Sequence, residues 1–425
     1  MRNTKIKKAA ASFALLLAIE TLLTACGQPV APAGGNPTNT LAPKPESKTE
    51  DTKENESKEE GSEQGSEKAT EEGKAEPKDY GTLKVSYPAG NIRIAINILA
   101  QQKGYFAEEG VTVEEINLMG NNALTAINDS EQLDILTVGF VPDLQAIASG
   151  YDLTFIGGTA VEGGALIAKK GEAHKYQDAD KIVNVDAIAE ASLGFVRNEA
   201  AWIVTRAYLL DNGISEETVA KIEDEANGNI SYYAENTETA QAVGKGSVEV
   251  GFLPMEFALL YADAYDLEII APAGALQPDY VCCREVTAPS RLEKKSDAFT
   301  AYEKARIRAF EFYKKGETDQ EVQDEVIKII TDYSGKETDY VKTYLYGGVT
   351  KYSTDPNATG IVKYVDAAVK SGALSSAAID FGTYDIKQNI NTDNYEKALK
   401  ELIEENKDNE FYADLLKKYE EANKI

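Results

Sequence analysis

The stretch "ILAQQKGYFAEEGVTVEE", Ile98 to Glu115, decides how this chain of 425 residues folds. It begins as a helix, which Gly104 ends because glycine readily adopts the left-handed conformation that closes a helix. Tyr105 and Phe106 are placed to fix the following turn to the core, and Gly110 permits the chain to reverse into a strand. The stretch therefore predicts a helix and a strand joined by a tight, anchored turn.

Strand-like and helix-like stretches alternate on both sides of this turn. Before it, Leu83–Tyr87 ("LKVSY") indicates a strand, and Asn91 is placed to cap the helix that runs through Lys103. After it, Asp134–Gly139 indicates a strand and Val141–Ser149 a helix. Such alternation is typical of an α/β fold in which a mainly parallel sheet carries helices on both faces.

Two domains are expected, because the residues from Tyr80 onward are too many for one typical hydrophobic core. A second alternating unit begins near Ile182, and Ser215 is placed to cap one of its helices. Beyond Ser290 the pattern becomes helical, with apolar side chains at helical spacing that are more typical of a core than of a site. They are Phe299, Tyr302, Ala309, Phe310 and Tyr313.

The first residues have the pattern of a targeting segment. A basic start precedes an apolar run, Ala9–Ala25, which is too short and too interrupted for a permanent membrane helix of about 20 apolar residues. Its end, Leu23–Cys26 ("LTAC"), resembles the bacterial lipobox, in which the cysteine takes a lipid and the chain is cut before it. Residues 1–25 are therefore predicted to be a lipoprotein signal peptide and Cys26 the lipidated residue. An ordinary secretory signal is the alternative.

Residues 26–79 are rich in Pro, Gly, Ser, Thr, Glu and Lys. Such a segment cannot bury enough apolar surface to offset its conformational entropy, so it is predicted to be a disordered, acidic tether. The whole chain carries a formal net charge of −27 at pH 7. So acidic a protein is a poor partner for nucleic acid or an anionic membrane surface, which leaves the lipid on Cys26 as the expected membrane contact.

The residues of the decisive turn, Lys103-Gly104-Tyr105-Phe106 and then Gly110, resemble the opening of ABC-transporter substrate-binding proteins of the sulfonate, nitrate, taurine and thiamine-precursor type. Three later stretches resemble that family in the same order: Asp134–Gly150, Val248–Ala262 and Asp380–Leu399. The resemblance implies an α/β fold with two lobes, a periplasmic-binding-protein-like flytrap of type II with extra C-terminal helices.

The resemblance also implies how the chain is divided and what it does. Lobe one would comprise residues 80–176 and 284–425, including the C-terminal helices, and lobe two residues 177–283. The cleft between them would capture a small solute and deliver it to an ABC permease with its ATPase. The expected molecule is a monomer without cofactor or metal, held by its lipid on the outer side of the cell membrane.

The expected ligand residues lie in loops that follow strands and in the segment that returns to lobe one. They are Tyr87, Asn91, Asn121, Asn122, Phe140, Val141, Thr159, Arg197, Asn198, Trp202, Met255, Glu256 and Tyr280. Loops at helix N-termini present free N–H groups, and Arg197 adds a bidentate donor, so an anion such as a sulfonate is one expectation. Trp202, the only tryptophan, could instead stack on a heterocycle or belong to the core of lobe two.

Two other functions stay open at this point. A related group makes a thiamine pyrimidine precursor with a catalytic histidine and a cysteine-rich motif, but this chain has one histidine, His174, in a polar stretch. Cys282-Cys283 lacks zinc-site spacing, and neighbouring thiols in a strand would face opposite sides, so two free thiols are expected, one of which could face the cleft. A surface lipoprotein without a transport role is the other alternative, although it would not need two α/β lobes.

Overall fold

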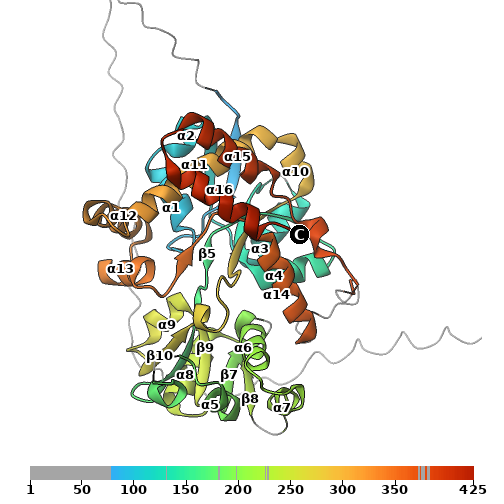
Figure 1. Ribbon diagram of the computed structural model, residues 1–425, viewed down its shortest axis with the longest axis vertical. Helices are drawn as coiled ribbons and strands as arrows, with labels where there is room; N and C mark the ends of the chain where they lie inside the picture. Colours follow the sequence, from blue (N-terminus) through green and yellow to red (C-terminus); the bar gives the residue numbers. More distant parts are fainter. Residues whose placement is uncertain are drawn as a thin grey trace, which may run out of the picture. The chain divides into compact units, whose positions relative to one another are not determined.

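The decisive turn forms as predicted in the computed structural model (Figure 1). α1 (Ala95–Gln102) is followed by Gly104, which has a φ of +76°. α2 (Tyr105–Glu108) is a single turn that buries Phe106, and β2 (Thr112–Ile116) begins just beyond it. The glycine thus ends one helix and the aromatic ring anchors the turn, which confirms both assignments.

The structure describes residues 78–425, apart from residues 131, 180–181, 198, 225, 227–228, 372–373, 375–378 and 381–382. The predicted signal peptide, the lipid site at Cys26 and nearly all of the predicted tether lie outside the described residues. So does Asn198, one of the expected ligand residues.

The first long helix begins later than predicted. Asn91 does not cap it, because α1 starts at Ala95. Instead Asn91 Oδ1 accepts a hydrogen bond of 2.9 Å from the backbone N–H of Arg93. Asparagine side chains commonly close a turn two residues ahead in this way, so the residue ends the loop before the helix.

The described strands of lobe one form three small sheets, one of which is the short β5–β12 pair given below. β1 (Thr82–Ser86) pairs in parallel with β2, and β11 (Cys283–Thr287) pairs antiparallel with both β3 (Leu136–Gly139) and β4 (Thr154–Gly158). An isolated parallel bridge connects β1 with the residue before β3. β11, which brings the chain back from lobe two, therefore lies in the middle of its sheet.

α11 (Ser296–Lys315) is the central helix of lobe one. It packs against α1 and α15 (Asp393–Glu405) and buries the predicted apolar stripe, including Phe299 and Tyr302. The stripe therefore belongs to the core, as predicted.

The other helices of this lobe are α3 (Gly120–Asp129), α4 (Phe140–Ala148), α10 (Pro289–Lys294), α12 (Gln320–Ser334), α13 (Thr338–Tyr346), α14 (Ala358–Lys370), α16 (Glu410–Ala422) and the short η4 (Ile386–Asn389).

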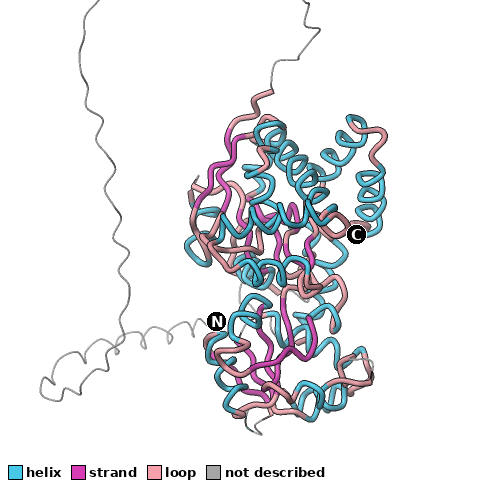
Figure 2. The backbone as a smooth tube through the Cα atoms, turned by 90° about the vertical axis from the view of Figure 1, so that its left-hand side faces the viewer, coloured by secondary structure: helices cyan, strands magenta, loops and turns pink. Residues whose placement is uncertain are grey.

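Lobe two is built on one five-stranded sheet of order β10-β6-β9-β7-β8, with helices around it (Figure 2). The strands are β6 (Gly164–Lys169), β7 (Leu193–Val196), β8 (Ile230–Tyr233), β9 (Val250–Pro254) and β10 (Leu267–Pro272). β7, β8 and β9 are parallel, and β6 is antiparallel to both β9 and β10, so it alone runs against the others. The sheet is therefore mixed, with most strands in one direction.

The helices of lobe two follow its strands in sequence. They are α5 (Val185–Glu190), α6 (Ala200–Asp211), α7 (Glu216–Ile222), α8 (Asn236–Lys245) and α9 (Met255–Tyr261), with the short helices η1 (Ala173–Tyr176) and η3 (Ala273–Ala275). The predicted cap at Ser215 is confirmed, because its side chain accepts a hydrogen bond of 3.2 Å from the N–H of Thr218.

The chain enters lobe two earlier than expected. The expected limit of lobe one at residue 176 includes β6, but β6 hydrogen-bonds with β9 and β10 of the second sheet. The first crossing therefore lies between β5 (Ala160–Val161), which pairs with β12 (Lys351–Tyr352), and β6. The return crossing lies between β10 and β11. A buried apolar run has the same pattern in either sheet, so its pattern does not reveal which sheet it joins.

A buried cluster of charges links α11 to the sheet of lobe one. Arg306 Nη1 lies 2.6 Å from Glu285 Oε2 and 2.8 Å from Glu303 Oε2, and all three side chains are buried. Burial, with the nearby charge of Glu285, raises the pKa of Glu303 to about 8 against the effect of Arg306. A Cβ at Gly157 of β4 would lie 2.8 Å from Arg306 Nη1, so a side chain at this position would displace the buried guanidinium.

Candidate functional site

Arg93 and Glu256 join the two lobes. Arg93 lies in the loop before α1 of lobe one, and Glu256 lies in the first turn of α9 of lobe two. Arg93 Nε donates a hydrogen bond of 2.8 Å to Glu256 Oε2, and Arg93 Nη2 donates to Glu256 Oε1. This bidentate geometry fixes the orientation of both groups and is typical of strong carboxylate recognition.

Glu199 and Asn236 bring two further polar groups to this pair. Glu199 immediately precedes α6 and Asn236 begins α8, both in lobe two. Burial is the main cause that raises the pKa of Glu199, and the charge of Glu256 adds to it. The charge of Arg93 and a hydrogen bond with Asn236 act in the opposite direction and lower this pKa by less. Asn236 Oδ1 is buried and has no hydrogen-bond partner among the described residues. Lobe two therefore presents a carboxylate and an amide oxygen that can accept hydrogen bonds.

Two thiols lie beside Arg93 on the segment that returns to lobe one. Cys282 Sγ and Cys283 Sγ are 3.6 Å apart, and both thiols are free. The hydrogen bond from Cys282 and the charge of Arg93 outweigh burial and lower the pKa of Cys283 to about 7. The expectation that the thiols face opposite sides is wrong, because Cys282 precedes β11 and its N–H closes a tight turn on Tyr280 O at 2.9 Å.

Two tyrosines of α13 complete the surroundings of the pair. Tyr340 Oη donates a hydrogen bond of 3.2 Å to the backbone oxygen of Glu256. Tyr344 is buried, and burial, with the charge of Glu256, raises its pKa well above 10.0. These phenols therefore stay neutral at ordinary pH and act as hydrogen-bonding or apolar groups.

Many of the expected ligand residues are buried in the cores of the two lobes. They are Tyr87, Phe140, Val141, Thr159, Trp202, Met255 and Tyr280. Trp202 Nε1 donates a hydrogen bond of 2.8 Å to Glu223 Oε1, which supports its reading as part of the core of lobe two. Thr159 Oγ1 has no hydrogen-bond partner among the described residues.

Other expected residues lie nearer the surface. Arg197 is exposed, and its guanidinium lies over the ring of Tyr232, with Cζ 4.3 Å from the ring centroid. Asn122 is exposed and Asn91 is half-buried, whereas the side chain of Asn121 is not described. Of the expected residues, Glu256 is the one whose side chain pairs with the guanidinium of Arg93.

Sequence reasoning missed Arg93 and Asn236, and it did not single out Glu199, although Glu199 lies in the expected loop from Arg197 to Trp202. All three stand between a strand and the following helix or in the first turn of that helix. This is the same kind of position that singled out the expected residues, and it is where ligands of α/β proteins usually bind. A census of every charged or amide side chain at such positions would have included them.

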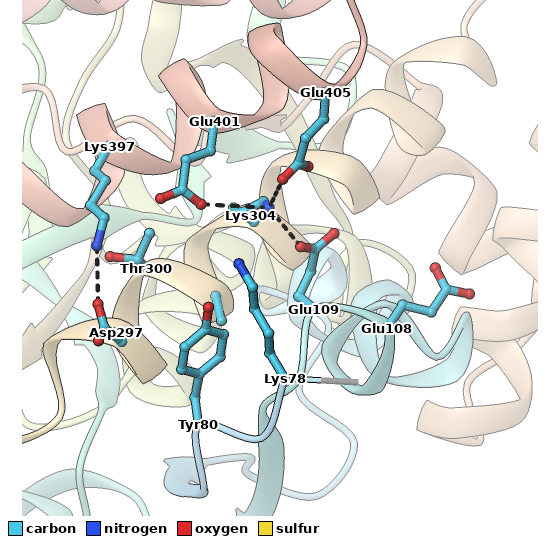
Figure 3. A pocket seen from close by; sticks show the side chains of 11 residues that line it. Lys78, Tyr80, Glu108, Glu109, Asp297, Thr300, Lys304, Lys397, Glu401 and Glu405 are labelled. Carbon is cyan, nitrogen blue, oxygen red and sulfur yellow. Dashed lines mark hydrogen bonds and ion pairs between the residues drawn. The ribbon is translucent and has the colours of Figure 1, made fainter. Parts of the chain in front are cut away.

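Two of the cavities in the described part of the chain illustrate what lies away from this pair. The larger, of about 740 Å³, borders the return segment, α14 and α16. The smaller, of about 310 Å³, surrounds Lys304 (Figure 3), whose Nζ lies 3.0 Å from Glu109 Oε2 and 2.7 Å from Glu405 Oε1. The carboxylates there already share a cation, so we interpret this cavity as an ion-pair network that ties α2, α11 and α15 together.

Comparison with solved structures shows the fold. The chain is similar to the periplasmic nitrate-binding protein of Synechocystis PCC 6803, with 14% identity over 76% of this chain and 89% of that chain and a TM-score of 0.56. It is also similar to a putative sulfonate-binding protein of Methylobacillus flagellatus KT (16% identity, 76% and 96% covered, TM-score 0.55). A ligand-binding component of an ABC-type import system from Staphylococcus aureus matches as well (13% identity, 75% and 99% covered, TM-score 0.54).

At these identities the likeness establishes the fold of periplasmic binding proteins and nothing about the ligand. No curated protein matches the sequence. The family model described as NMT1/THI5 like matches residues 91–316, which is more than half of the chain. The chain therefore belongs to the NMT1/THI5-like family.

Proposed function

We propose that this protein is the solute-binding component of an ABC import system and that it captures a small molecule between its two lobes. The observation that carries the proposal is the Arg93–Glu256 pair, because it brings charged groups from both lobes to one place. A solute bound beside this pair would favour the arrangement in which the lobes meet, as hinged binding proteins require. An ABC permease and its ATPase would receive the solute.

The charges at this place favour a solute that donates hydrogen bonds. Arg93 is already engaged by Glu256, whereas Glu199 and the unpartnered Asn236 Oδ1 can accept hydrogen bonds. A sulfonate or nitrate carries no hydrogen-bond donor, so it would leave these two acceptors without a partner. A buried acceptor without a donor costs free energy. We therefore favour an amine-bearing or heterocyclic solute over an anion.

The proposed location follows from the N-terminal sequence. A lipid on Cys26 would hold the protein at the outer side of the cell membrane, with residues 26–79 as the tether. Within the described residues, no helix is long and apolar enough to cross a membrane.

A ligand screen tests the proposal. The full chain is heated with amines, amino-acid-like compounds, pyrimidines, flavins, sulfonates and nitrate, and each hit is measured by calorimetry. We expect an N–H-bearing hit, and we expect Glu199→Gln to weaken its binding about tenfold or more, because a charge-assisted hydrogen bond contributes about 1.5–3 kcal/mol. Glu108→Gln is the matched control, since Glu108 is exposed on α2 and pairs with Arg308.

Three outcomes would contradict parts of this proposal. Binding of a sulfonate that is indifferent to Glu199→Gln would overturn the solute class. A solute that binds Arg93→Ala, the variant whose lobes are expected to separate, without compacting it in small-angle scattering would overturn the flytrap mechanism. Chemical conversion of the solute, seen by mass spectrometry, would favour the enzyme alternative, for which His174 is an exposed residue of η1.

A further inference from the structure

Cys282 and Cys283 lie where the two crossing segments of the chain meet. Cys282 belongs to the return segment, and a Cβ placed on Gly163 of the first crossing would lie 3.0 Å from Cys282 Sγ. The hydrogen bond with Cys283 and burial raise the pKa of Cys282, and the nearby backbone N–H of Gly163 counteracts this rise. The sulfur of Cys283 is 3.6 Å from that of Cys282. The dithiol thus touches both connections between the lobes.

The two thiols differ in access. Cys282 is half-buried, whereas Cys283 is buried. A small molecule can therefore reach Cys282 first, and Cys283 is held next to it as a second sulfur. The hydrogen bond between the sulfurs and the nearby charge of Arg93 lower the pKa of Cys283 and so stabilise its thiolate. The thiolate is the reactive form of cysteine.

We propose that Cys282 and Cys283 are a reversible dithiol–disulfide site, which a low-molecular-weight disulfide oxidises. This role is independent of the solute-binding function. Cys282 passes its proton across the hydrogen bond between the sulfurs to the Cys283 thiolate and attacks one sulfur of the small disulfide. A mixed disulfide forms, and the small thiolate that is released takes that proton and leaves as a thiol. The Cys283 thiolate then attacks Cys282 Sγ and releases the second small thiol. Two protein thiols are oxidised, one small disulfide is reduced, and the two protons leave on the released thiols.

The bond between adjacent cysteines is expected to be easily reduced. Neighbouring Cα atoms are about 3.8 Å apart, whereas disulfides prefer about 5.5–6 Å, so the ring is strained. Strained disulfides have more oxidising potentials and are the labile ones, which makes the site reversible. Oxidation also removes the thiolate beside Arg93 and draws the Cys282 sulfur, which lies close to Gly163, toward Cys283, so it changes contacts at both crossings.

Thiol chemistry on the full chain tests the proposal. The Cys26→Ala background leaves the two thiols of interest, since the chain has three cysteines. After incubation with oxidised glutathione, we expect native protein to lose both free thiols and the mass of two hydrogen atoms, with no glutathione attached, and dithiothreitol to restore both thiols. Cys283→Ser should keep one glutathione on Cys282, and Cys282→Ser should stay unmodified because Cys283 is buried.

Two further measurements keep the proposal falsifiable. In guanidinium the same treatment should give stable mixed disulfides, because the native placement of the sulfurs is lost. In native oxidised protein, amide exchange at Gly163 should be faster than in reduced protein. The proposal is overturned if native protein keeps two free thiols or a lasting glutathione adduct, or if the unfolded chain forms the internal disulfide equally well. An unchanged exchange rate at Gly163 would overturn the link to the crossings.

Discussion

The side chain of Glu162 accepts a hydrogen bond of 2.8 Å from the backbone N–H of Asp279, and both residues have a φ of +57°. Glu162 stands in the first crossing between the lobes and Asp279 in the return crossing. Glu162 also pairs with Lys351, whose Nζ lies 3.0 Å from Oε1. Glu162 and Asp279 therefore both have a backbone conformation that residues other than glycine rarely adopt. The buried carboxylate of Glu162 holds the two residues together.

Removing this carboxylate should destabilise the fold. Glu162→Ala deprives the N–H of Asp279 of its acceptor and Lys351 of its partner, so we expect the free energy of unfolding to fall by about 1–3 kcal/mol. Urea unfolding of both proteins measures the change. Asp263→Ala is the control, because Asp263 is 97% exposed in its pair with Lys170 and should change stability little. Equal stability of Glu162→Ala and wild type would contradict the link between the crossings.

Breaking the Arg93–Glu256 pair should let the lobes separate in the absence of solute. We expect Arg93→Ala to have a larger radius of gyration than wild type in small-angle scattering, because the bidentate contact between the lobes is lost. Lys103→Ala is the matched control, since Lys103 pairs with Glu325 within lobe one. An unchanged radius in Arg93→Ala would show that other contacts hold the lobes together.

The buried Glu303 should make stability fall as the pH rises. Its pKa is about 8 in the folded protein against an ordinary value of 4.5, so between these pH values the folded state binds more protons than the unfolded state. The contribution of this group to the free energy of unfolding is therefore fully present below pH 4.5 and is lost as the pH rises through about 8. Glu303→Gln should therefore gain stability relative to wild type from pH 5 to pH 9 in urea titrations. Glu401→Gln, at a partly exposed carboxylate near Lys304, should show no such trend.

A side chain at Gly157 should disrupt the same cluster. In Gly157→Ala the added Cβ would lie 2.8 Å from Arg306 Nη1 and 3.1 Å from both Glu285 Oε2 and Glu303 Oε1. Displacing buried charges from their partners is costly, so we expect a loss of about 3 kcal/mol or more in thermal or urea unfolding. Gly139→Ala is the control, because its Cβ would meet Pro142 at an ordinary 3.6 Å.

The N-terminal proposal has a direct test as well. Cys26→Ala should abolish labelling with palmitate and shift the protein from the membrane fraction to the soluble fraction, or leave it uncleaved, because the acidic chain has no other expected membrane contact. Wild-type protein without label, or a cleaved variant that stays in the membrane fraction, would argue against the lipid.

Local patterns in the sequence were enough to predict most of the fold. The turn at Gly104, the stripe of α11 and the cap at Ser215 each depend on residues a few positions apart, and all three form as predicted. The limit of lobe one was not predictable in this way. β6 is apolar and fully buried except at its end, and only pairing with β9, far along the chain, assigns it to lobe two.

The candidate site depends more strongly on tertiary structure. Arg93 and Glu256 are 163 residues apart, and no local pattern couples them. The dithiol was misjudged for a related reason. The rule that neighbouring side chains alternate holds within a strand, but the turn at Tyr280 precedes β11 and brings both sulfurs together.

The Arg93–Glu256 pair also has a consequence for the sensitivity of a receptor. In the empty protein this pair holds the two lobes together, so a solute would reach Glu199 and Asn236 only in molecules whose pair is broken. Only the fraction of molecules with a broken pair would be ready to bind, and the apparent dissociation constant rises as that fraction falls. Each 1.4 kcal/mol in the strength of the pair would raise the concentration needed for half-occupancy about tenfold. One ion pair could thus set the detection threshold, independently of how well the solute fits.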